Sequence, residues 1–429
     1  MQKDCIKKMQ RSTSDRISHL PGNVIEKILM SMPMHDAVRT SVLSRKWRYA
    51  WVTLPQLVFD DAFYRKLRRT PKDKFMMTIY QVMLLHRGPI MKFKLSVPIL
   101  EGCPEIDQLI LFVSNNGIQE LILHIRQGKP YKLPSSFFSC LQLERLELNY
   151  CFFNPPLGFQ GFTMLLSLEL WDVFLTSVVF KRLISSCPLL ERLKVLNRWR
   201  TFNCFEIDAP NLKSLFCAGQ FISVYVKNAP KLARVSISLY EWMPWERYEG
   251  GEICNWVTFS ASLPAIEFLE LDYGCLKFIS AGGIPYRLPT DLSHLKNLKL
   301  HIESVDVFSS ILCLLRSSPN LEKFAIGIPI YADEDEETVA KLSEVQGCSD
   351  ISLNQLREVE LEEAWGRRFG LEFIKLLLAK SPVLEKMVIV ADNLIGRERL
   401  KFLQKVTQFR RCSPLAEVYS EVPDDDQGY

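Results

Sequence analysis

A six-residue hydrophobic pattern recurs along most of the 429-residue chain. In each copy, as in "LERLEL", the first, fourth and sixth residues are apolar and those between them are mostly polar. The alternation at the fourth and sixth positions is typical of a short β-strand with one buried face. The copies begin at Ile90, Ile118, Leu143, Leu165, Leu190, Leu212, Leu232, Ile266, Leu295, Leu321, Leu356 and Leu384. The pattern therefore predicts a chain of repeated units that each contribute one strand.

The spacing of the copies indicates the kind of repeat. From Leu143 onward, successive copies begin 22, 25, 22, 20, 34, 29, 26, 35 and 28 residues apart. The shorter spacings match the period of leucine-rich repeats, and the longer ones imply insertions in loops. One unit cannot bury its apolar face alone, whereas stacked neighbours form a continuous core. We therefore predict an α/β leucine-rich-repeat solenoid.

Prolines that precede the pattern predict a helix in each unit. Six copies have a proline two residues before their first apolar position, namely Pro188, Pro210, Pro230, Pro264, Pro319 and Pro382. Upstream of three of them, apolar residues lie eight, five and four residues back, as Phe180, Leu183 and Ile184 do before Pro188. That spacing places them on one helical face, and proline ends a helix. An ordinary α/β domain would not explain this shared register.

A separate helical segment is predicted ahead of the repeats. Its first part, "LPGNVIEKILMSMP", has Asn23 placed to cap a helix, with Glu26 three residues on, and Pro33 placed to end it. The apolar stripe of this helix is Val24, Ile25, Ile28, Leu29 and Met32. The second part, "DAVRTSVLSRKWRYAW", places Leu43, Trp47, Ala50 and Trp51 on one helical face. So short a segment makes a poor independent core, and its apolar stripe needs a partner.

Composition and charge narrow the class of protein. Hydrophobic residues make up 48% and charged residues 24%, which is normal for a soluble folded protein. The net charge of +4 is too small to indicate a nucleic-acid partner, and the tryptophans in the basic stretch "SRKWRYAW" are expected to pack in the helical unit. No run reaches the roughly 18 apolar residues of a membrane helix. The twelve cysteines form no CxxC pair. We therefore predict a reduced, intracellular protein with cysteines in its core and no membrane or nucleic-acid partner.

Motifs of catalysis and metal binding are missing from the sequence. It contains no phosphate-binding G-x-x-x-x-G-K-[ST] loop, no HExxH and no paired CxxC motifs. We therefore predict no catalytic residues, no metal site and no cofactor. The insertion at residues 240–256, rich in tryptophan and glycine, either contacts a partner or covers an edge of the solenoid, and the sequence does not decide between the two. The acidic stretch "YADEDEETVAKLSEVQGC" is expected to be a solvated loop.

The helical segment carries a resemblance to a known domain. The stretch "DRISHLPGNVIEKILMSMPMHDAVRTSVLSRKWRYAWVTLP" resembles an F-box of the plant type, with a Leu-Pro pair, an apolar helix, a break at proline and then T-S-x-L-S-R-K-W. Residues 352–418 resemble the FBD region that ends many plant F-box proteins. With the repeats between them, the whole chain is similar to the plant F-box/FBD/LRR-repeat family. The implied division is a disordered tail at 1–14, an F-box at 15–61, a linker or cap at 62–89, leucine-rich repeats at 90–350, an FBD region continuing the repeats at 351–418 and an acidic tail at 419–429.

The resemblance implies a function. F-box proteins bind a Skp1-like adaptor, which connects them to a cullin, and they hold a protein substrate near a ubiquitin-conjugating enzyme without doing bond chemistry themselves. By position, the adaptor-binding residues would be Leu20, Pro21, Ile25, Ile28, Leu29, Met32, Val38, Leu43 and Trp47. Gly22 and Asn23 stand where many members carry an acidic residue, and Met34 replaces a common polar residue, so adaptor binding is expected to be weakened but retained. The expected location is the cytoplasm or the nucleus.

Two functional hypotheses stay open at this point. The first is a substrate receptor of a Skp1–cullin–F-box ubiquitin ligase, and the second is a repeat module that acts without the ligase and has a non-functional F-box. In both, the strand face of the solenoid is the natural surface for an unidentified protein target. Charged positions interleaved with the repeat leucines are expected to line it: Glu144, Arg145, Glu147, Glu191, Arg192, Lys194, Lys296, Asn297, Lys299, Arg357, Glu358 and Glu360. Because their charges are mixed, these residues do not identify the target.

Overall fold

The computed structural model describes residues 17, 19–67, 71–97, 103–125, 128–199, 204–221, 223–240, 256–328, 351–363, 368–390 and 397–421. The chain divides into two compact units, Met1–Cys151 and Phe152–Tyr429. The predicted tail at 1–14, residues 422–429 of the predicted acidic tail, the inserted residues 241–255 and the acidic stretch at 331–348 lie outside the described residues. Residues 419–421, predicted to begin the acidic tail, belong to a strand.

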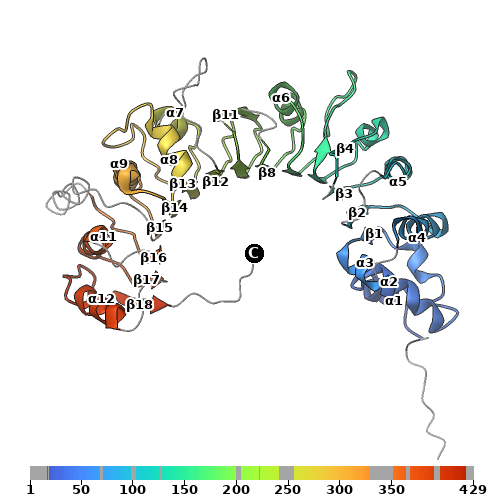
Figure 1. Cartoon of the computed structure of the whole chain (residues 1–429), viewed down its shortest axis with the longest axis horizontal. Helices are drawn as coiled ribbons and strands as arrows, with labels where there is room; N and C mark the ends of the chain where they lie inside the picture. The colour runs from blue at the N-terminus through green and yellow to red at the C-terminus, as the bar shows by residue number, and fades with distance from the viewer. Residues whose placement is uncertain are drawn as a thin grey trace, which may run out of the picture. The chain divides into compact units, whose positions relative to one another are not determined.

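The smaller unit combines short helices with a parallel sheet (Figure 1). Its helices are α1 (Gly22–Met30), α2 (Met34–Arg39), η1 (Thr40–Val42), η2 (Ala50–Thr53), α3 (Asp61–Lys66), α4 (Lys72–Leu85), α5 (Ile106–Ser114) and η3 (Ser135–Ser139). Its sheet has the order β1 (Gln56–Phe59), β2 (Lys92–Val97), β3 (Glu120–Ile125) and β5 (Arg145–Asn149). Each of these strands runs parallel to the next, as stacked repeats require. The short strands β4 (Tyr131–Lys132) and β6 (Cys151–Phe152) complete the region.

The first strand lies inside the segment predicted to be the F-box. Gln56 to Phe59 pair with Lys92 to Leu95, so β1 is the first strand of the repeat sheet. The four residues "QLVF" lack the six-residue pattern, which is why the strand escaped the sequence prediction. Leu57 and Phe59 are fully buried, and the ring of Phe59 packs edge-on against Phe63 and Phe93 at centroid distances of 5.2 and 6.0 Å. The helical segment and the first repeat therefore share one core.

The larger unit continues the same architecture. Its main sheet has the order β7 (Ser167–Trp171), β8 (Arg192–Asn197), β10 (Ser214–Gly219), β12 (Arg234–Leu239), β13 (Phe268–Asp272), β14 (Asn297–His301), β15 (Lys323–Ile328), β16 (Glu358–Glu363), β17 (Lys386–Val390) and β18 (Glu417–Glu421). The helices lie on one side of it: α6 (Ser177–Ser185), α7 (Trp256–Ala261), α8 (Tyr273–Ser280), η5 (Val305–Val307), α9 (Phe308–Arg316), α11 (Arg368–Lys380) and α12 (Arg397–Thr407) (Figure 1). The strands predicted from the six-residue pattern are confirmed, and each begins two residues after the first apolar position.

The predicted helices are confirmed where the helical spacing was visible. Phe180, Leu183 and Ile184 of α6 are all buried, and the matching residues of α9 and α11 are buried as well. Helix α7 precedes Pro264 in the same register, with Trp256 and Phe259 buried eight and five residues before it. The sequence did not predict this helix, because Ser260 stands where the third apolar residue of the pattern would lie.

Two repeats depart from the predicted helix–proline–strand order. The segments before Pro210 and Pro230 form strands β9 (Cys204–Asp208) and β11 (Ser223–Asn228), which pair with each other in a separate two-stranded sheet. These repeats have the shortest spacings, 22 and 20 residues, which leave little room for a helix. Their sequences "FEID" and "VYVK" also alternate polar and apolar residues, which favours a strand. The prediction of a helix in every unit was therefore wrong at this point.

The N-terminal helices also differ from the prediction in detail. Helix α1 begins at Gly22 after Pro21 and has no side-chain cap, so Asn23 lies in its first turn and does not cap it. The second helix ends at Arg39, and the chain then passes through η1, a turn and η2. Leu43 is consequently 50% exposed, whereas Trp47 and Trp51 are buried. The four apolar residues predicted for one helical face do not share one.

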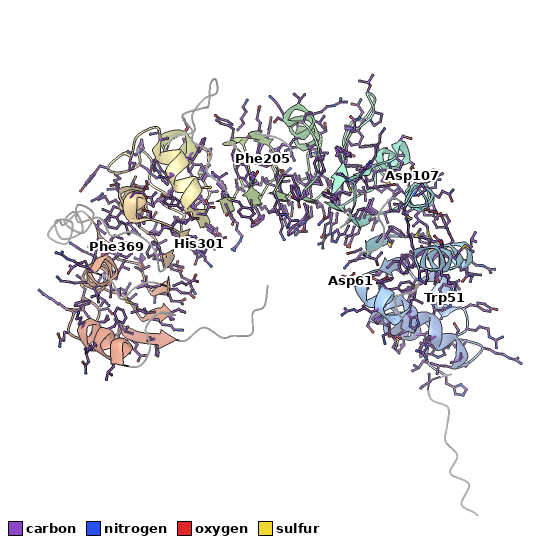
Figure 2. The ribbon with its side chains drawn as sticks, in the orientation of Figure 1. Trp51, Asp61, Asp107, Phe205, His301 and Phe369 are labelled. Carbon is purple, nitrogen blue, oxygen red and sulfur yellow. The ribbon has the colours of Figure 1, made fainter. Side chains whose placement is uncertain are left out.

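The strands divide their side chains between two faces. In β8, Leu193 and Val195 are buried against the helix side, while Arg192 and Lys194 are exposed on the opposite side. We call this opposite side the helix-free face, because no helix in the described part of the chain covers it (Figure 1). In Figure 2, His301 lies on the strands and Phe369 on the helix side. The α/β repeat fold predicted from the sequence is thus confirmed in each unit.

Candidate functional site

The N-terminal helices present a group of exposed apolar side chains. These are Ile17 (50% exposed), Met30 (42%), Met32 (38%), Val42 (87%), Leu43 (50%) and Tyr49 (67%). Met30 ends α1 and Val42 ends η1, while the others belong to the chain before α1, the break between α1 and α2, and the segment between η1 and η2. Exposed apolar side chains gathered on one small helical segment are typical of a protein-binding surface. We call this group the F-box apolar surface.

The residues predicted to bind the adaptor fall into three classes of burial. Pro21, Met32 and Leu43 are exposed, and Leu20, Ile28 and Val38 are half-buried. Ile25, Leu29 and Trp47 are 1–2% exposed and belong to the core of the helical segment. The amphipathic stripe seen in the sequence is therefore divided between the segment's own core and its surface. Sequence spacing could not make this division, because it depends on the fold of the segment that carries Trp47.

Trp47 and its neighbours hold the F-box apolar surface in place. The indole Nε1 of Trp47 donates a hydrogen bond to the carbonyl oxygen of Ile17 at 3.1 Å. The ammonium group of Lys46 donates to the carbonyl oxygen of Leu20. At the other end of α1, the amide of Gln56 donates to the carbonyl oxygen of Met30 at 2.7 Å. The buried tryptophan and the first repeat strand thus position both ends of the helix.

Packing does not require a glycine at position 22, where α1 begins. A Cβ atom added at Gly22 would meet nothing within 4 Å. An acidic side chain, which the resemblance leads one to expect here, would therefore fit without a clash. It would also lie near the positive end of the helix dipole, where an acidic group is favourable. Gly22 thus occupies an open surface position that could accept a larger, charged side chain.

A second polar region follows the edge where the repeat strands begin. From the Leu190 repeat onward, the residue just after the first apolar position alternates in charge along this edge, with an interruption at Ala233. The order is Glu191, Lys213, Ala233, Glu267, Lys296, Glu322, Arg357 and Glu385. Their backbones are hydrogen-bonded from one to the next, as from Lys296 N to Glu267 O at 2.9 Å and from Glu322 N to Lys296 O at 2.8 Å. Ion pairs join Glu191 to Lys213 (2.7 Å), Lys296 to Glu322 (3.7 Å) and Arg357 to Glu385 (2.5 Å). We call this row the charge ladder.

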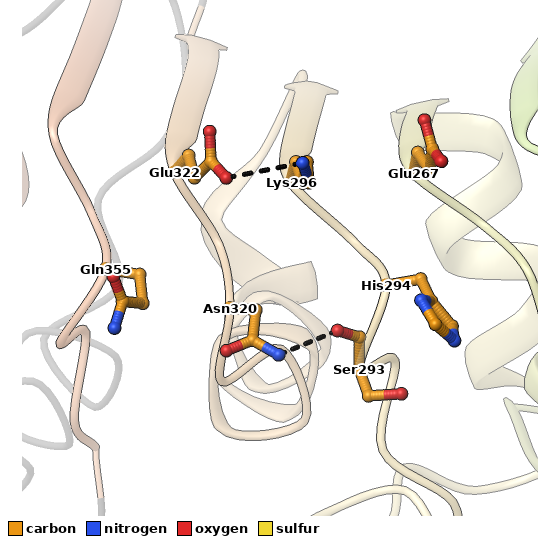
Figure 3. Close-up of a pocket in the computed structure, with 7 residues that line it drawn as sticks. All are labelled: Glu267, Ser293, His294, Lys296, Asn320, Glu322 and Gln355. Atoms are coloured by element: carbon orange, nitrogen blue, oxygen red, sulfur yellow. Dashed lines mark hydrogen bonds and ion pairs between the residues drawn. The ribbon is translucent and has the colours of Figure 1, made fainter.

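A shallow polar hollow opens along the charge ladder (Figure 3). It is lined by Glu267, Ser293, His294, Lys296, Asn320, Glu322 and Gln355. Asn320 donates a hydrogen bond from Nδ2 to the carbonyl oxygen of Ser293 at 2.8 Å, and Lys296 pairs with Glu322 (Figure 3). Asn211 makes the equivalent bond to Pro188 at 2.9 Å in another repeat. The polar groups of this hollow therefore serve contacts between repeats and do not form a catalytic constellation.

The charged residues that the sequence predicted to line the strand face lie at two different places. Glu144, Glu191, Lys296 and Arg357 precede their strands, and three of them belong to the charge ladder, while the other predicted residues lie on strands. Glu270 is the centre of one cluster on the helix-free face. Its Oε1 lies 3.3 Å from Nε2 of His301, and its Oε2 accepts a hydrogen bond from the hydroxyl of Ser236 at 2.7 Å. The hydrogen bond from His301 is the main cause that lowers the pKa of Glu270 to about 2. This carboxylate is therefore ionised at neutral pH and already has partners.

The cysteines in the described part of the chain show no sign of activation. Seven of the eight free thiols there are buried, as expected for core residues, and Cys412 is exposed. Burial raises the pKa of Cys187 and of Cys313 to about 11, and that of Cys140 to about 12. These thiols stay protonated at neutral pH and are poor nucleophiles.

The described residues also bear on metal binding and on membrane insertion. No group of three or more His, Cys, Asp and Glu side chains there is arranged to hold a metal ion. Among those residues no helix is both long and apolar enough to cross a membrane.

Comparison with known proteins agrees with this architecture. Residues 17–58 match the family profile of the F-box domain, and residues 106–326 match a profile described as the LRR repeats of FBD-associated F-box protein At5g56370. The F-box/FBD/LRR-repeat protein At1g13570 of Arabidopsis thaliana is 38% identical over 411 residues, which cover 94% of this chain and 98% of that protein. The FBD-associated F-box protein At3g52670 of the same plant is 26% identical over 93% of this chain and 95% of its own length. The chain therefore belongs to the plant F-box/FBD/LRR-repeat protein family.

Proposed function

We propose that this protein is the substrate-recognition subunit of a Skp1–cullin–F-box ubiquitin ligase. In this role the N-terminal helices bind a Skp1-like adaptor, and through it a cullin, while the repeats and the FBD region bind a protein target. Proteins of the F-box/LRR family are generally non-catalytic adaptors, and an F-box domain implies binding of a Skp1-like protein. Catalysis would then consist of holding the target near a charged conjugating enzyme. We place this activity in the cytoplasm or the nucleus.

The F-box apolar surface is the observation that supports adaptor binding most strongly. Met32 and Leu43 expose 38% and 50% of their surface, although they lie beside core residues such as Leu29 and Trp47 in the sequence. Covering such side chains with a partner would contribute about 25 cal/mol for each Å² of apolar surface removed from water. We propose that Pro21, Met32 and Leu43 contact the adaptor directly. Ile25, Leu29 and Trp47 would then support that surface from beneath.

Co-purification with a Skp1-like adaptor tests this proposal. We expect Met32→Asp and Leu43→Asp each to weaken the complex at least tenfold, because a carboxylate would be buried against an apolar partner. Leu84→Asp is the matched control, since Leu84 is 83% exposed on α4, outside the F-box helices. This variant should bind the adaptor like the wild type. Thermal unfolding of all three variants would show whether a loss of binding reflects misfolding.

Two outcomes would count against the ligase hypothesis. If the wild-type chain fails to bind any Skp1-like protein, the hypothesis of a repeat module that acts without the ligase gains support. If Met32→Asp and Leu43→Asp bind as well as Leu84→Asp, the adaptor uses a different surface. A positive result would be extended by affinity purification with the proteasome and cullin neddylation inhibited, so that the target stays bound.

A further inference from the structure

Two arginines flank one serine on the helix-free face of the larger unit. Ser214 of β10 is paired in register with Arg192 of β8 on one side and with Arg234 of β12 on the other. Since neighbouring strands lie about 4.8 Å apart, the Cα atoms of the two arginines are about 10 Å apart. Long side chains from both can reach one group placed above Ser214. This arrangement has the geometry of a clamp for an anionic group.

The guanidinium groups of this clamp have no carboxylate partner within the described part of the chain. Both arginines are exposed, and neither has a described carboxylate oxygen within 4.0 Å. Arg234 places its Cζ 4.4 Å from the ring centroid of Phe268 on β13, the strand on the side of β12 away from Ser214. To meet a group above Ser214, this guanidinium must turn back toward β10, which its long side chain allows. Carboxylates on or beside the neighbouring strands have other partners: Glu169 and Glu191 are paired with Lys194 and Lys213, and Glu270 of β13 with His301 and Ser236.

Elsewhere on the same face, basic and acidic side chains pair with each other. Lys323 pairs with Glu358 at 2.6 Å, and Lys299 lies 4.0 Å from Glu362. Arg192 and Arg234 are thus exposed cations that no described carboxylate compensates. Arginine suits such a position because its planar group binds carboxylates in a bidentate way and loses little solvation.

An apolar surface adjoins the clamp. Phe216 follows Ser214 on β10 and lies diagonal to Leu196 of β8, which is paired with Trp171 of β7. All three side chains are half-buried, although the helix-free face is the side of the sheet away from the core. The indole Nε1 of Trp171 is buried without a hydrogen-bond partner among the described residues. Tryptophan and arginine in such a setting are the residue types that dominate binding energy at protein interfaces.

We propose that this surface, formed by Arg192, Arg234, Phe216, Leu196 and Trp171, binds an acidic segment of the target protein that carries an aromatic or aliphatic anchor. A carboxylate of that segment would lie between the two arginines, and the anchor would pack on Phe216 and Leu196. The inference rests on the proposed role as substrate receptor, because it assigns the chemical class of the target. Charge complementarity selects an acidic segment, and the adjoining apolar side chains favour a peptide over a bare anion.

Binding of labelled peptide pools to the purified full chain, measured with and without a Skp1-like adaptor, tests this inference. One fluorescein-labelled decapeptide pool would hold two glutamates beside a fixed phenylalanine, and a matched pool would hold two lysines in their place. Fluorescence anisotropy should show at least tenfold tighter binding of the acidic pool. The double variant R192E/R234E should lose that preference, and Phe216→Ser should weaken binding of the acidic pool at least threefold.

The double variant K401E/K405E provides a matched control, since it makes the same charge change at two exposed positions on helix α12. It should leave the preference for the acidic pool unchanged. The inference is overturned if the wild-type chain does not prefer the acidic pool, or if R192E/R234E still prefers it. It is also overturned if a phosphoserine pool or a single-stranded RNA binds more tightly than the acidic pool at this surface.

Adaptor binding by the same variants separates this inference from the proposed function. R192E/R234E should co-purify with the Skp1-like adaptor as the wild type does, because both arginines lie in the repeats. Loss of adaptor binding in the wild type, with the peptide preference retained, would refute the ligase role and leave the target surface standing. If the wild type binds the adaptor but shows no preference for the acidic pool, the target surface is refuted and the ligase role stands.

Discussion

Replacing Phe59 with alanine should weaken the region where the F-box meets the repeats. Phe59 is fully buried on β1, with edge-on aromatic contacts to Phe63 and Phe93. Removing a buried phenylalanine side chain costs about 3–5 kcal/mol. Each lost aromatic pair accounts for about 0.5–1.5 kcal/mol of that cost. Phe59→Leu keeps most of the aliphatic volume and should therefore cost about 1–3 kcal/mol.

Native-state hydrogen exchange gives a local measurement of this effect. The amides of Met91 and Lys92 donate to the carbonyl oxygen of Pro55 at 2.8 and 3.0 Å, so they report on opening of the first repeat. A loss of about 3 kcal/mol corresponds to roughly 100-fold faster exchange at these amides if they open with the region. Tyr49→Ala, at a side chain that is 67% exposed, is the control and should change exchange less than threefold. Equal exchange rates in Phe59→Ala and the Tyr49 control would refute the shared core.

Three further substitutions test the packing and charges of the repeats. Lys296→Glu would place three acidic residues in a row on the charge ladder with Glu267 and Glu322, and we expect a loss of about 1 kcal/mol in urea unfolding that 1 M NaCl removes. Gly219→Ala should lower the unfolding midpoint strongly, because its φ of 120° disfavours a side chain and the added Cβ would lie 2.2 Å from a carbonyl oxygen of the neighbouring strand. Because the folded-state pKa of Glu270 is lowered to about 2, its contribution to stability should be present above its ordinary pKa of 4.5 and lost as the pH falls toward 2. Glu270→Gln should remove that part of the pH dependence in acid unfolding.

The repeats were predictable from sequence because their signals are local. The six-residue pattern fixes which residues of a strand face the core, as Leu193 and Val195 do in β8. The spacing before Pro188 likewise fixes which residues of α6 are buried. Such signals need no knowledge of distant contacts. The prediction failed at β9 and β11, where Pro210 and Pro230 follow strands and not helices. There we assumed one helix in each repeat, although the local sequence alternates polar and apolar residues as a strand does.

The candidate sites depended on contacts that the sequence does not reveal. Ile25 is buried and Met32 is exposed, although both belong to the same predicted apolar stripe. This difference results from the fold of the segment around Trp47 and not from helical spacing. The pairing of Arg192 and Arg234 across Ser214 requires the register of three strands from three repeats. The sequence placed Arg192 among the charged residues of the strand face, but it did not indicate Arg234, Phe216 or Trp171. Loop insertions of variable length conceal which residues of neighbouring repeats lie side by side.

The shared core also determines how the F-box can be removed in an experiment. A deletion that ends at residue 60 takes away β1 together with the F-box, and it exposes the edge of β2 and the ring of Phe93. Leu57 and Phe59 are fully buried, and burial of each contributes about 1.5–3 kcal/mol, so the shortened repeats should be less stable by about 3–6 kcal/mol. A chain that begins at Ala50 keeps β1 but lacks α1 and α2, and it should be more stable than the chain that begins at Asp61 and retain target binding. If the chain that begins at Asp61 is as stable as the one that begins at Ala50, β1 is not part of the repeat core. Otherwise, loss of target binding after the longer deletion reflects damaged repeats, and only surface substitutions such as Leu43→Asp can isolate the role of the adaptor.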